Sequence, residues 1–324
     1  MENIKRLNGA IFSAPMFFKS NGEVDYSSYE NYITKCVESE GVEVIFAMAY
    51  NTRFRQLSEE EIIKVSKITC DLANSFEKKA IIGHPYTITS KELSTFCSIV
   101  SQFKPYAISI LYPERYYGMT KPLQDFFNIP KEHNIKVLVH EQKLVSGFNG
   151  KLIDWPDNLI NCILKEENVI AVKEDSKDNN MTSKILKLSE KYNFDVIVAG
   201  GGKRRVKELI KSDNLKCWLN GSLMLFPELA KIISEAYLRN DVKLIQLYEE
   251  KIEIPYFDEF ISKVGWHVGH KAALHILGYC ELNERSPMPI ISDENLNLFA
   301  PIIKKLEQNA NEIIDKLKLH QNKQ

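Results

Sequence analysis

The first 235 residues alternate between two hydrophobic patterns. One is a short, nearly continuous apolar run, typical of a strand that is buried on both faces. Eight such runs occur, at Gly9–Ala14, Val42–Ala49, Lys79–His84, Tyr106–Tyr112, Ile135–His140, Asn168–Lys173, Phe194–Ala199 and Lys216–Asn220. The other pattern has helical spacing and lies between the runs, at Tyr26–Glu38, Ser58–Phe76, Ser90–Phe103, Thr120–His133, Pro156–Lys165, Thr182–Tyr192 and Val206–Lys211, with another helix beginning near Pro227.

This alternation predicts an α/β fold of the (β/α)₈ TIM-barrel type. Nearly continuous apolar strands separated by helices require parallel pairing with both faces of the sheet covered. Eight such units are the number that closes into a barrel. An open doubly wound sheet is the alternative, but it has fewer strands as a rule, and no glycine fingerprint follows the first strand of this chain.

The alternation stops after residue 235. Helical patterns then follow at Asp241–Ile254, Tyr256–Gly278 and Asp293–Leu319, with no apolar strand between them. Pro287 and Pro289 break the chain before the last of these helices. We therefore predict a barrel domain over residues 1–235 and a C-terminal helical extension over residues 236–324.

Composition and charge favour a small-molecule partner. The chain has 42 basic and 43 acidic residues, and no block of like charge, so it offers no basic field for nucleic acid. Six cysteines without a CxxC pair, and an amino terminus without an apolar core, indicate a reduced, cytoplasmic protein. No apolar stretch approaches the ~20 residues that span a bilayer, so no membrane partner is expected.

Lys173 is the strongest candidate for chemistry. A lysine at the end of a strand is usually solvated, and with Glu174 beside it a plain surface charge is the alternative interpretation. In a barrel, however, the active site lies at the carboxyl ends of the strands, and Lys173 ends the sixth. Burial there would lower the pKa of the amine until a nucleophile exists near neutral pH, and such an amine can attack a carbonyl.

Further motifs occur in order around Lys173. The opening strand and turn, residues 8–17, precede Asn21-Gly22-Glu23-Val24-Asp25, and a late helical segment, residues 271–278, precedes Arg285-Ser286-Pro287-Met288-Pro289. Together with the run Val-Ile-Ala-Val-Lys-Glu that contains Lys173, these segments resemble the dihydrodipicolinate synthase and N-acetylneuraminate lyase family of Schiff-base aldolases. The resemblance extends over nearly the whole chain.

The resemblance implies a class I aldolase mechanism. In it the Lys173 amine condenses with the ketone of a 2-oxo acid such as pyruvate. The resulting iminium acts as an electron sink, so that a neighbouring carbon–carbon bond forms or breaks without a metal or any other cofactor. Members of the family commonly assemble as dimers or tetramers, so the resemblance also implies a homodimer or homotetramer.

The second strand departs from the family pattern. Where the family has a threonine pair and a glutamate, this chain has Tyr50, Asn51 and Arg53. An amide can bind a carboxylate but cannot relay a proton, so Tyr50 or Thr52 is the candidate for the missing hydroxyl. Arg53 offers a bidentate fork for an acidic substrate. The alternative is that Arg53 lies on a solvated loop.

The fifth strand departs as well. The tyrosine that donates and accepts protons in the family is absent, and His140 occupies the end of the strand. Imidazole titrates near neutral pH and can move the same protons, so His140 is the candidate acid–base residue. The alternative is a hydrogen-bonded histidine with a structural role.

Other candidates for substrate binding follow the fourth and seventh strands. Gly200-Gly201-Gly202 and Lys203 offer backbone amides and a cation for a carboxylate or phosphate, although these charges are equally consistent with a solvated helix turn. Tyr112, which is followed by Tyr116 and Tyr117, aligns with a family aromatic pair and is equally consistent with packing. His267, His270 and His275 share a helical segment without a cysteine or carboxylate motif, so we predict no metal site there.

The sequence therefore favours a Schiff-base aldolase or lyase that acts on pyruvate or another 2-oxo acid, one option being an acid derived from a sugar. Lys173, His140 and Tyr50 are the predicted catalytic residues. Two alternatives stay open at this stage. One is a dehydratase of a deoxy-keto sugar acid, which uses the same iminium. The other is an inactive homologue that binds 2-oxo acids in a regulatory role.

Overall fold

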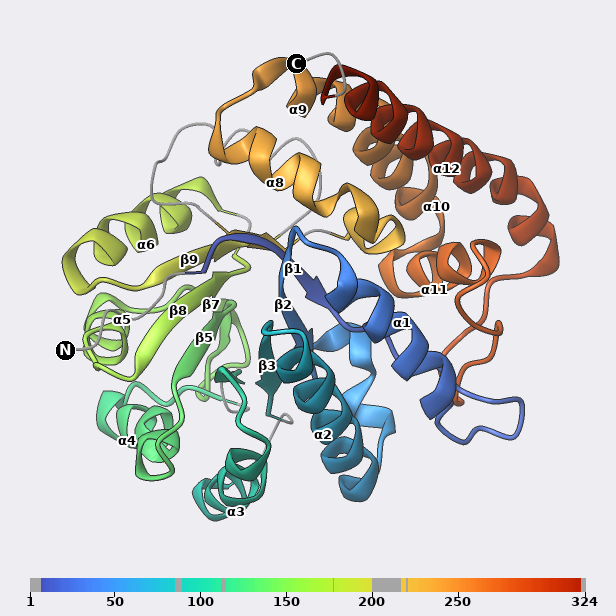
Figure 1. Ribbon diagram of the computed structural model, residues 1–324. Coiled ribbons are helices and arrows are strands. Elements are labelled where there is room, and N and C mark those ends of the chain that lie inside the picture. Colours follow the sequence, from blue (N-terminus) through green and yellow to red (C-terminus); the bar gives the residue numbers. More distant parts are fainter. Residues whose placement is uncertain are drawn as a thin grey trace.

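The computed structural model describes residues 7–84, 89–111, 115–176, 178–199, 217–219 and 221–321. Its central element is a closed barrel with the strand order β1-β10-β9-β8-β5-β4-β3-β2, in which every neighbouring pair is parallel (Figure 1). The strands are β1 Gly9–Ser13, β2 Val42–Ala47, β3 Lys79–Gly83, β4 Ala107–Ile110, β5 Val137–Glu141, β8 Val169–Glu174, β9 Asp195–Val198 and β10 Cys217–Leu219. The TIM-barrel prediction is confirmed.

The residues of each strand alternate between two hydrophobic layers. On β5, Leu138 belongs to a cluster inside the barrel with Ile11, Phe46, Ile81 and Ala171. Val137 and Val139, one residue away on either side, belong to the larger cluster between the strands and the helices. Because side chains on a strand alternate between faces, a strand buried on both faces is apolar throughout, as the sequence pattern indicated.

Helices cover the outside of the barrel (Figure 1). They are α1 Tyr26–Glu38, α2 Glu59–Ser75, α3 Ser90–Val100, α4 Thr120–Glu132, α5 Asp157–Leu164, α6 Asn179–Tyr192 and α8 Ala230–Leu238. Local signals set several of their starts: Ser58 with Glu61, and Thr89 with Glu92, form reciprocal capping boxes. The helix predicted at Val206–Lys211 lies outside the described residues. The domain boundary after residue 235 stays a prediction, and α8 runs across it.

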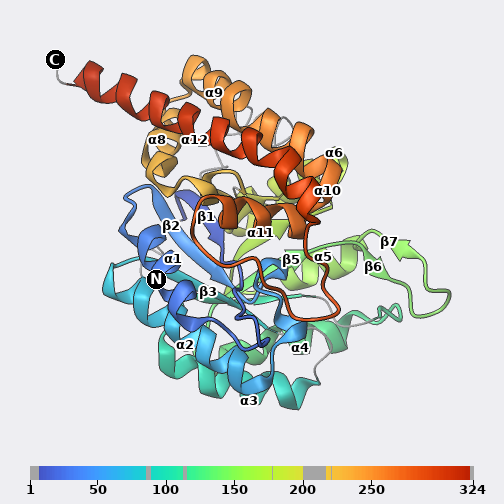
Figure 2. The ribbon, with the colours of Figure 1, turned by 90° about the vertical axis from the view of Figure 1, so that its right-hand side faces the viewer.

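One insertion was not predicted as regular structure. Between β5 and α5 the chain forms a small antiparallel hairpin, in which β6 Leu144–Val145 pairs with β7 Leu152–Ile153. The hairpin projects away from the barrel (Figure 2). The hairpin begins at Leu144, after β5 has ended at Glu141. It therefore does not displace the residues at the end of that strand.

The C-terminal extension packs as a helical layer against one side of the barrel (Figures 1 and 2). Its elements are α9 Val242–Tyr248, the π-helical segments η6 Glu249–Glu253 and η7 Pro255–Ile261, α10 Ser262–Val264, α11 Trp266–Ile276 and α12 Asp293–Gln321. Within the described part of the chain, no helix is long and apolar enough to cross a membrane.

The break within this layer differs from the prediction. We expected helices to divide near Ile254, but the helical backbone continues through Pro255, which opens a π-helical segment. The chain breaks instead at Gly265, whose φ of +84° is one that residues with a β-carbon rarely adopt. This break starts α11 at Trp266, at the mouth of the barrel, and thereby brings the extension into the site described next.

Candidate active site

A cavity of about 590 Å³ opens at the carboxyl ends of the strands. Most of its polar lining comes from β1, the segment after β2, and the ends of β5 and β8, namely Ser13, Tyr50, Asn51, Gln142, Lys173 and Asp175, and His267 of α11 is the remaining polar residue. Its remaining lining includes residues of β10, η7 and α11. A cavity in this position is where barrels of this type carry their active sites.

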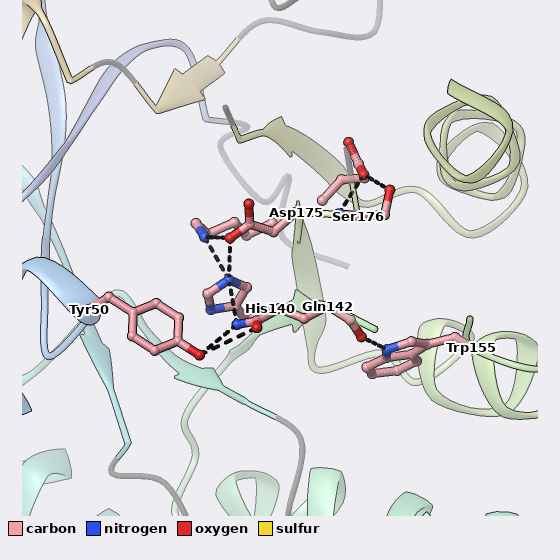
Figure 3. A network of polar contacts seen from close by, with 8 residues as sticks. Tyr50, His140, Gln142, Trp155, Asp175 and Ser176 are labelled. Atoms are coloured by element: carbon pink, nitrogen blue, oxygen red, sulfur yellow. Dashed lines mark hydrogen bonds and ion pairs between the residues drawn. The ribbon is translucent and has the colours of Figure 1, made fainter. Parts of the chain in front are cut away.

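A compact polar network joins His140, Asp175 and Gln142 near the ends of β5 and β8 (Figure 3). Lys173 belongs to this network, since its Nζ donates to Asp175 Oδ2 at 2.7 Å and lies 2.6 Å from His140 Nε2. His140 Nε2 lies 3.1 Å from the same carboxylate oxygen. The register explains this geometry, since His140 on β5 pairs directly with Lys173 on β8, and Asp175, two residues further along the chain, points to the same side.

Burial sets the charges of this network. Lys173 and His140 are 5% and 1% exposed. Burial and the charge of Lys173 lower the pKa of His140 to about 4, although Asp175 opposes the shift. Burial alone would raise the pKa of Asp175, but the charge of Lys173 and the neighbouring His140 outweigh it and hold that pKa well below its usual range. At neutral pH the resting network therefore contains a neutral imidazole and a carboxylate.

Gln142 connects this network to Tyr50. Its Nε2 donates to the Tyr50 hydroxyl at 3.0 Å and lies 3.4 Å from His140 Nε2. The Trp155 indole donates to the backbone carbonyl of Gln142 at 2.5 Å and so holds the chain where it leaves β5 (Figure 3). Two of the predicted catalytic residues, His140 and Tyr50, are thus brought to the same side of the cavity as Lys173.

Asn51 lines the cavity between β1 and α11. Its Oδ1 accepts from the Trp266 indole at 2.5 Å, and its Nδ2 donates to the Ser13 carbonyl at 3.3 Å. These two bonds fix which end of the amide is the donor. Trp266 packs so closely on the backbone of Gly221 that a Cβ there would lie 2.2 Å from the indole ring.

Arg53 and Thr52 lie beside the cavity but are not among its lining residues. The Thr52 hydroxyl donates to the Ala14 carbonyl at 2.7 Å. The Arg53 guanidinium donates to His267 Nδ1 at 2.5 Å and forms an ion pair with Glu284 at 3.1 Å. Arg53 also has a left-handed backbone, with φ of +57°, which is uncommon for a residue with a side chain. Substrate binding by these two residues stays a prediction, and the contacts of Arg53 tie the segment after β2 to α11.

Several predicted residues lie elsewhere. Tyr112, Gly200, Gly201 and Lys203 fall outside the described residues. Tyr117 is 51% exposed, and neither it nor Tyr116 lines the cavity. In the part of the chain that the structure describes, no group of three or more histidine, cysteine, aspartate or glutamate side chains could hold a metal ion.

Sequence reasoning missed four residues of this site: Asp175, Gln142, Trp266 and His267. Asp175 follows Lys173, and Gln142 follows His140, each by two positions. The alternation of side chains along an extended chain was therefore a usable signal for both. Trp266 and His267 lie in the C-terminal extension, and no local pattern connects that segment with the barrel mouth.

A second pair of carboxyl groups lies behind the network, on the outer face of the same two strands. Glu141 and Glu174 are register partners on β5 and β8 and are both fully buried. Glu174 accepts from the Ser176 amide and the Thr182 hydroxyl, each at 2.9 Å. Burial, with the charge of Glu174 as a second cause, raises the pKa of Glu141 to about 7.

The folded protein should therefore lose stability as Glu141 ionises. Because the folded pKa exceeds the ordinary value of 4.5, the favourable contribution is complete below pH 4.5 and is lost as the pH rises towards 7. We expect Glu141→Gln to remove this loss and to raise the free energy of unfolding at pH 8 by up to roughly 3 kcal/mol. Urea unfolding of both proteins between pH 4.5 and 8 measures the difference. Glu30→Gln, at an exposed position, is the control, and its free energy of unfolding should follow that of the wild type at every pH. If the free energies of unfolding of Glu141→Gln and the wild type changed in parallel with pH, the raised pKa of Glu141 would be contradicted.

Comparisons with known proteins find several similar chains. No family model matches. The 4-hydroxy-tetrahydrodipicolinate synthase of Fervidobacterium nodosum is 24% identical over 296 residues, which cover 89% of this chain and 94% of that protein. Among solved structures, dihydrodipicolinate synthase from Aquifex aeolicus has a TM-score of 0.76 at 19% identity, covering 93% of this chain and 98% of that one. N-acetylneuraminate lyase from Fusobacterium nucleatum also has a TM-score of 0.76, at 15% identity and with the same coverage of the two chains.

Proposed function

We propose that this chain, a divergent relative of the dihydrodipicolinate synthase and N-acetylneuraminate lyase family, is a carbon–carbon lyase that acts on pyruvate or another 2-oxo acid through an iminium on Lys173. One observation carries the proposal. The amine of Lys173 borders the cavity at the end of its strand, within hydrogen-bonding distance of a neutral imidazole and a carboxylate.

His140 and Asp175 supply the proton transfers of iminium formation. To attack the ketone, the Lys173 amine must give up a proton, and His140 Nε2 at 2.6 Å is placed to accept it. Asp175 then stabilises the imidazolium through the same Nε2, at 3.1 Å. The attack yields a carbinolamine. Return of the proton to its hydroxyl releases water and leaves the iminium.

The iminium then permits cleavage of a 4-hydroxy-2-oxo acid. The bond between C3 and C4 breaks, and its electron pair moves into the iminium to form an enamine. The C4 hydroxyl loses its proton and becomes the aldehyde. His140, neutral again after water release, can take this proton, or the Tyr50 hydroxyl can relay it to solvent by accepting it as it releases its own. Protonation of the enamine and hydrolysis return pyruvate and the free lysine, so the cycle needs no oxidant or reductant.

The carboxylate of the 2-oxo acid fits the polar side of the cavity. The Asn51 amide, held by Trp266 and the Ser13 carbonyl, is the donor we assign to it. Cleavage of an acid derived from a sugar would use the same iminium and the same carboxylate site. Dehydration of a deoxy-keto sugar acid would use them as well. The 2-oxo acid end is therefore common to all these substrates, and the other end distinguishes them.

Borohydride reduction in the presence of pyruvate tests the proposal. We expect a reduced carboxyethyl adduct on Lys173, located by peptide mass spectrometry. Lys271 is an internal control, because it is also buried and its pKa is lowered by burial, but its Nζ donates to the Met16 carbonyl and it does not border the main cavity. Absence of an adduct on Lys173 in folded protein would overturn the proposal. An adduct without turnover of any 2-oxo acid would instead indicate the binding homologue.

We also propose a homo-oligomer in a reducing, cytoplasmic setting. The assembly rests on the resemblance to enzymes that form dimers or tetramers. The compartment rests on the six cysteines, all of which are unpaired.

A further inference from the structure

The cavity has two walls of different chemistry. Apart from Ala49, the lining contributed by residues 13–175 is polar. From residue 199 onwards the described lining is apolar except for His267, and comprises Ala199, Leu219, Gly221, Met224, Phe257, Ile261 and Trp266. The strand order contributes to this division, because β9 and β10, which end at Val198 and Leu219, lie next to each other between β8 and β1. Among the described residues of this second wall, His267 is the one side chain that can form a hydrogen bond with a hydroxyl group through a polar atom not already bonded within the wall.

The apolar wall contains two aromatic rings. The rings of Phe257 and Trp266 are stacked, with centroids 5.9 Å apart and an angle of 9° between their planes. The indole N–H is already used, since it donates to Asn51. Burying a hydroxyl group against such a surface without a partner costs free energy, whereas burying an apolar ring is favourable.

His267 is the polar exception, and its chemistry is restricted to donation. A guanidinium can only donate, so the contact of Arg53 with His267 Nδ1 makes that nitrogen the acceptor and leaves the proton on Nε2. Glu284 holds the guanidinium in place from its other side. Burial and the charge of Arg53 keep the imidazole neutral at ordinary pH. His267 thus offers one fixed N–H donor at the edge of the apolar wall.

We propose that the aldehyde partner of the reaction is a flat, apolar aldehyde, aromatic or conjugated, that carries one hydrogen-bond-accepting oxygen for His267. The inference rests on the proposed function, because it assigns the end of the substrate opposite the Schiff base. The apolar wall disfavours aldehydes with several hydroxyl groups. Cleavage of a sugar-derived substrate would release an aldehyde of that kind.

Condensation of pyruvate with three aldehydes tests the inference: benzaldehyde, a methoxybenzaldehyde and glyceraldehyde. We expect kcat/KM for the aromatic aldehydes to exceed that for glyceraldehyde by at least about tenfold, with the methoxy compound the better of the two. Glyceraldehyde as the preferred partner, or no reaction with either aromatic aldehyde, would overturn the inference while leaving pyruvate trapping on Lys173 intact. Failure of the trapping itself would overturn the proposed function.

Two variants test whether the apolar wall causes the preference for aromatic aldehydes. Phe257→Gln should lower the ratio of aromatic to glyceraldehyde kcat/KM by about tenfold, because it removes one of the two aromatic rings of the wall. His267→Phe should remove the advantage of the methoxy compound over benzaldehyde, also by about tenfold. Pyruvate trapping on Lys173 shows that each variant is folded. Phe76→Gln is the matched control, since Phe76 is an exposed residue at the C-terminal end of α2 and is not among the residues that line the cavity, and an equal change in that variant would contradict the assignment.

Discussion

Lys173→Arg is expected to abolish carbon–carbon cleavage while the barrel stays folded. A guanidinium keeps the positive charge beside Asp175, but it is not deprotonated in proteins and so cannot attack a ketone. We expect kcat/KM for release of pyruvate from a 4-hydroxy-2-oxo acid to fall by on the order of 10⁴-fold or more. A coupled assay for pyruvate measures the loss, and circular dichroism reports the fold.

The arginine variant separates covalent chemistry from electrostatics. Lys173→Ala also removes the amine, but it leaves Asp175 without its partner charge, so its loss of activity alone is less informative. Lys143→Arg is the matched control, because Lys143 forms a similar ion pair with Asp154 at 3.4 Å on the surface. It should keep full activity. Cleavage retained in Lys173→Arg would rule out the iminium.

His140→Gln is expected to have the second largest effect. Glutamine keeps a polar group beside Lys173 and Asp175, but it cannot accept a proton. Loss of general acid–base catalysis should lower kcat by about 10²- to 10⁴-fold. Prolonged borohydride trapping with pyruvate should still label Lys173, because the amine remains. The comparison of kcat with the final extent of trapping distinguishes lost proton transfer from a lost site.

The pH profile gives a second measure of the same residue. The His140 base must be unprotonated, and its pKa is about 4, so kcat/KM should fall as the pH falls through 4. This acidic limb should disappear in His140→Gln. His133→Gln is the control, since His133 contacts Ser94 at the end of α4 and should leave the profile unchanged. A His140→Gln enzyme with unchanged kcat would reassign the proton transfers to Tyr50, and Tyr50→Phe would then carry the loss.

Much of the barrel was predictable because its signals are local. Strands buried on both faces are apolar throughout, and the capping boxes at Ser58 and Thr89 mark helix starts within four residues of sequence. The same locality explains why the position of Lys173 at the cavity was predictable, since the residue that ends an apolar strand of a barrel lies at its mouth. The hairpin after β5 was missed because its two-residue strands are too short for a hydrophobic period.

The partners of Lys173 show where local reasoning ends. Asp175 was within reach, because it follows the lysine by two residues on an extended chain. The approach of His140 to Lys173 depends on the register between β5 and β8, which the sequence does not state. Arg53 illustrates the same limit: its strand-end position suggested a substrate, but Glu284 and His267, more than 200 residues away, hold its guanidinium.

The sequence by itself determined the alternation of strands and helices, the barrel and the position of Lys173 at its mouth, because hydrophobic periodicity and strand ends are properties of neighbouring residues. Only the tertiary structure decided which groups surround that lysine and what forms the far wall of the cavity. The break at Gly265 directs Trp266 and His267 into the barrel mouth, and their neighbours there come from segments far away along the chain. Contacts between distant segments arise from packing, and hydrophobic packing constrains which faces meet without identifying the polar pairs that result.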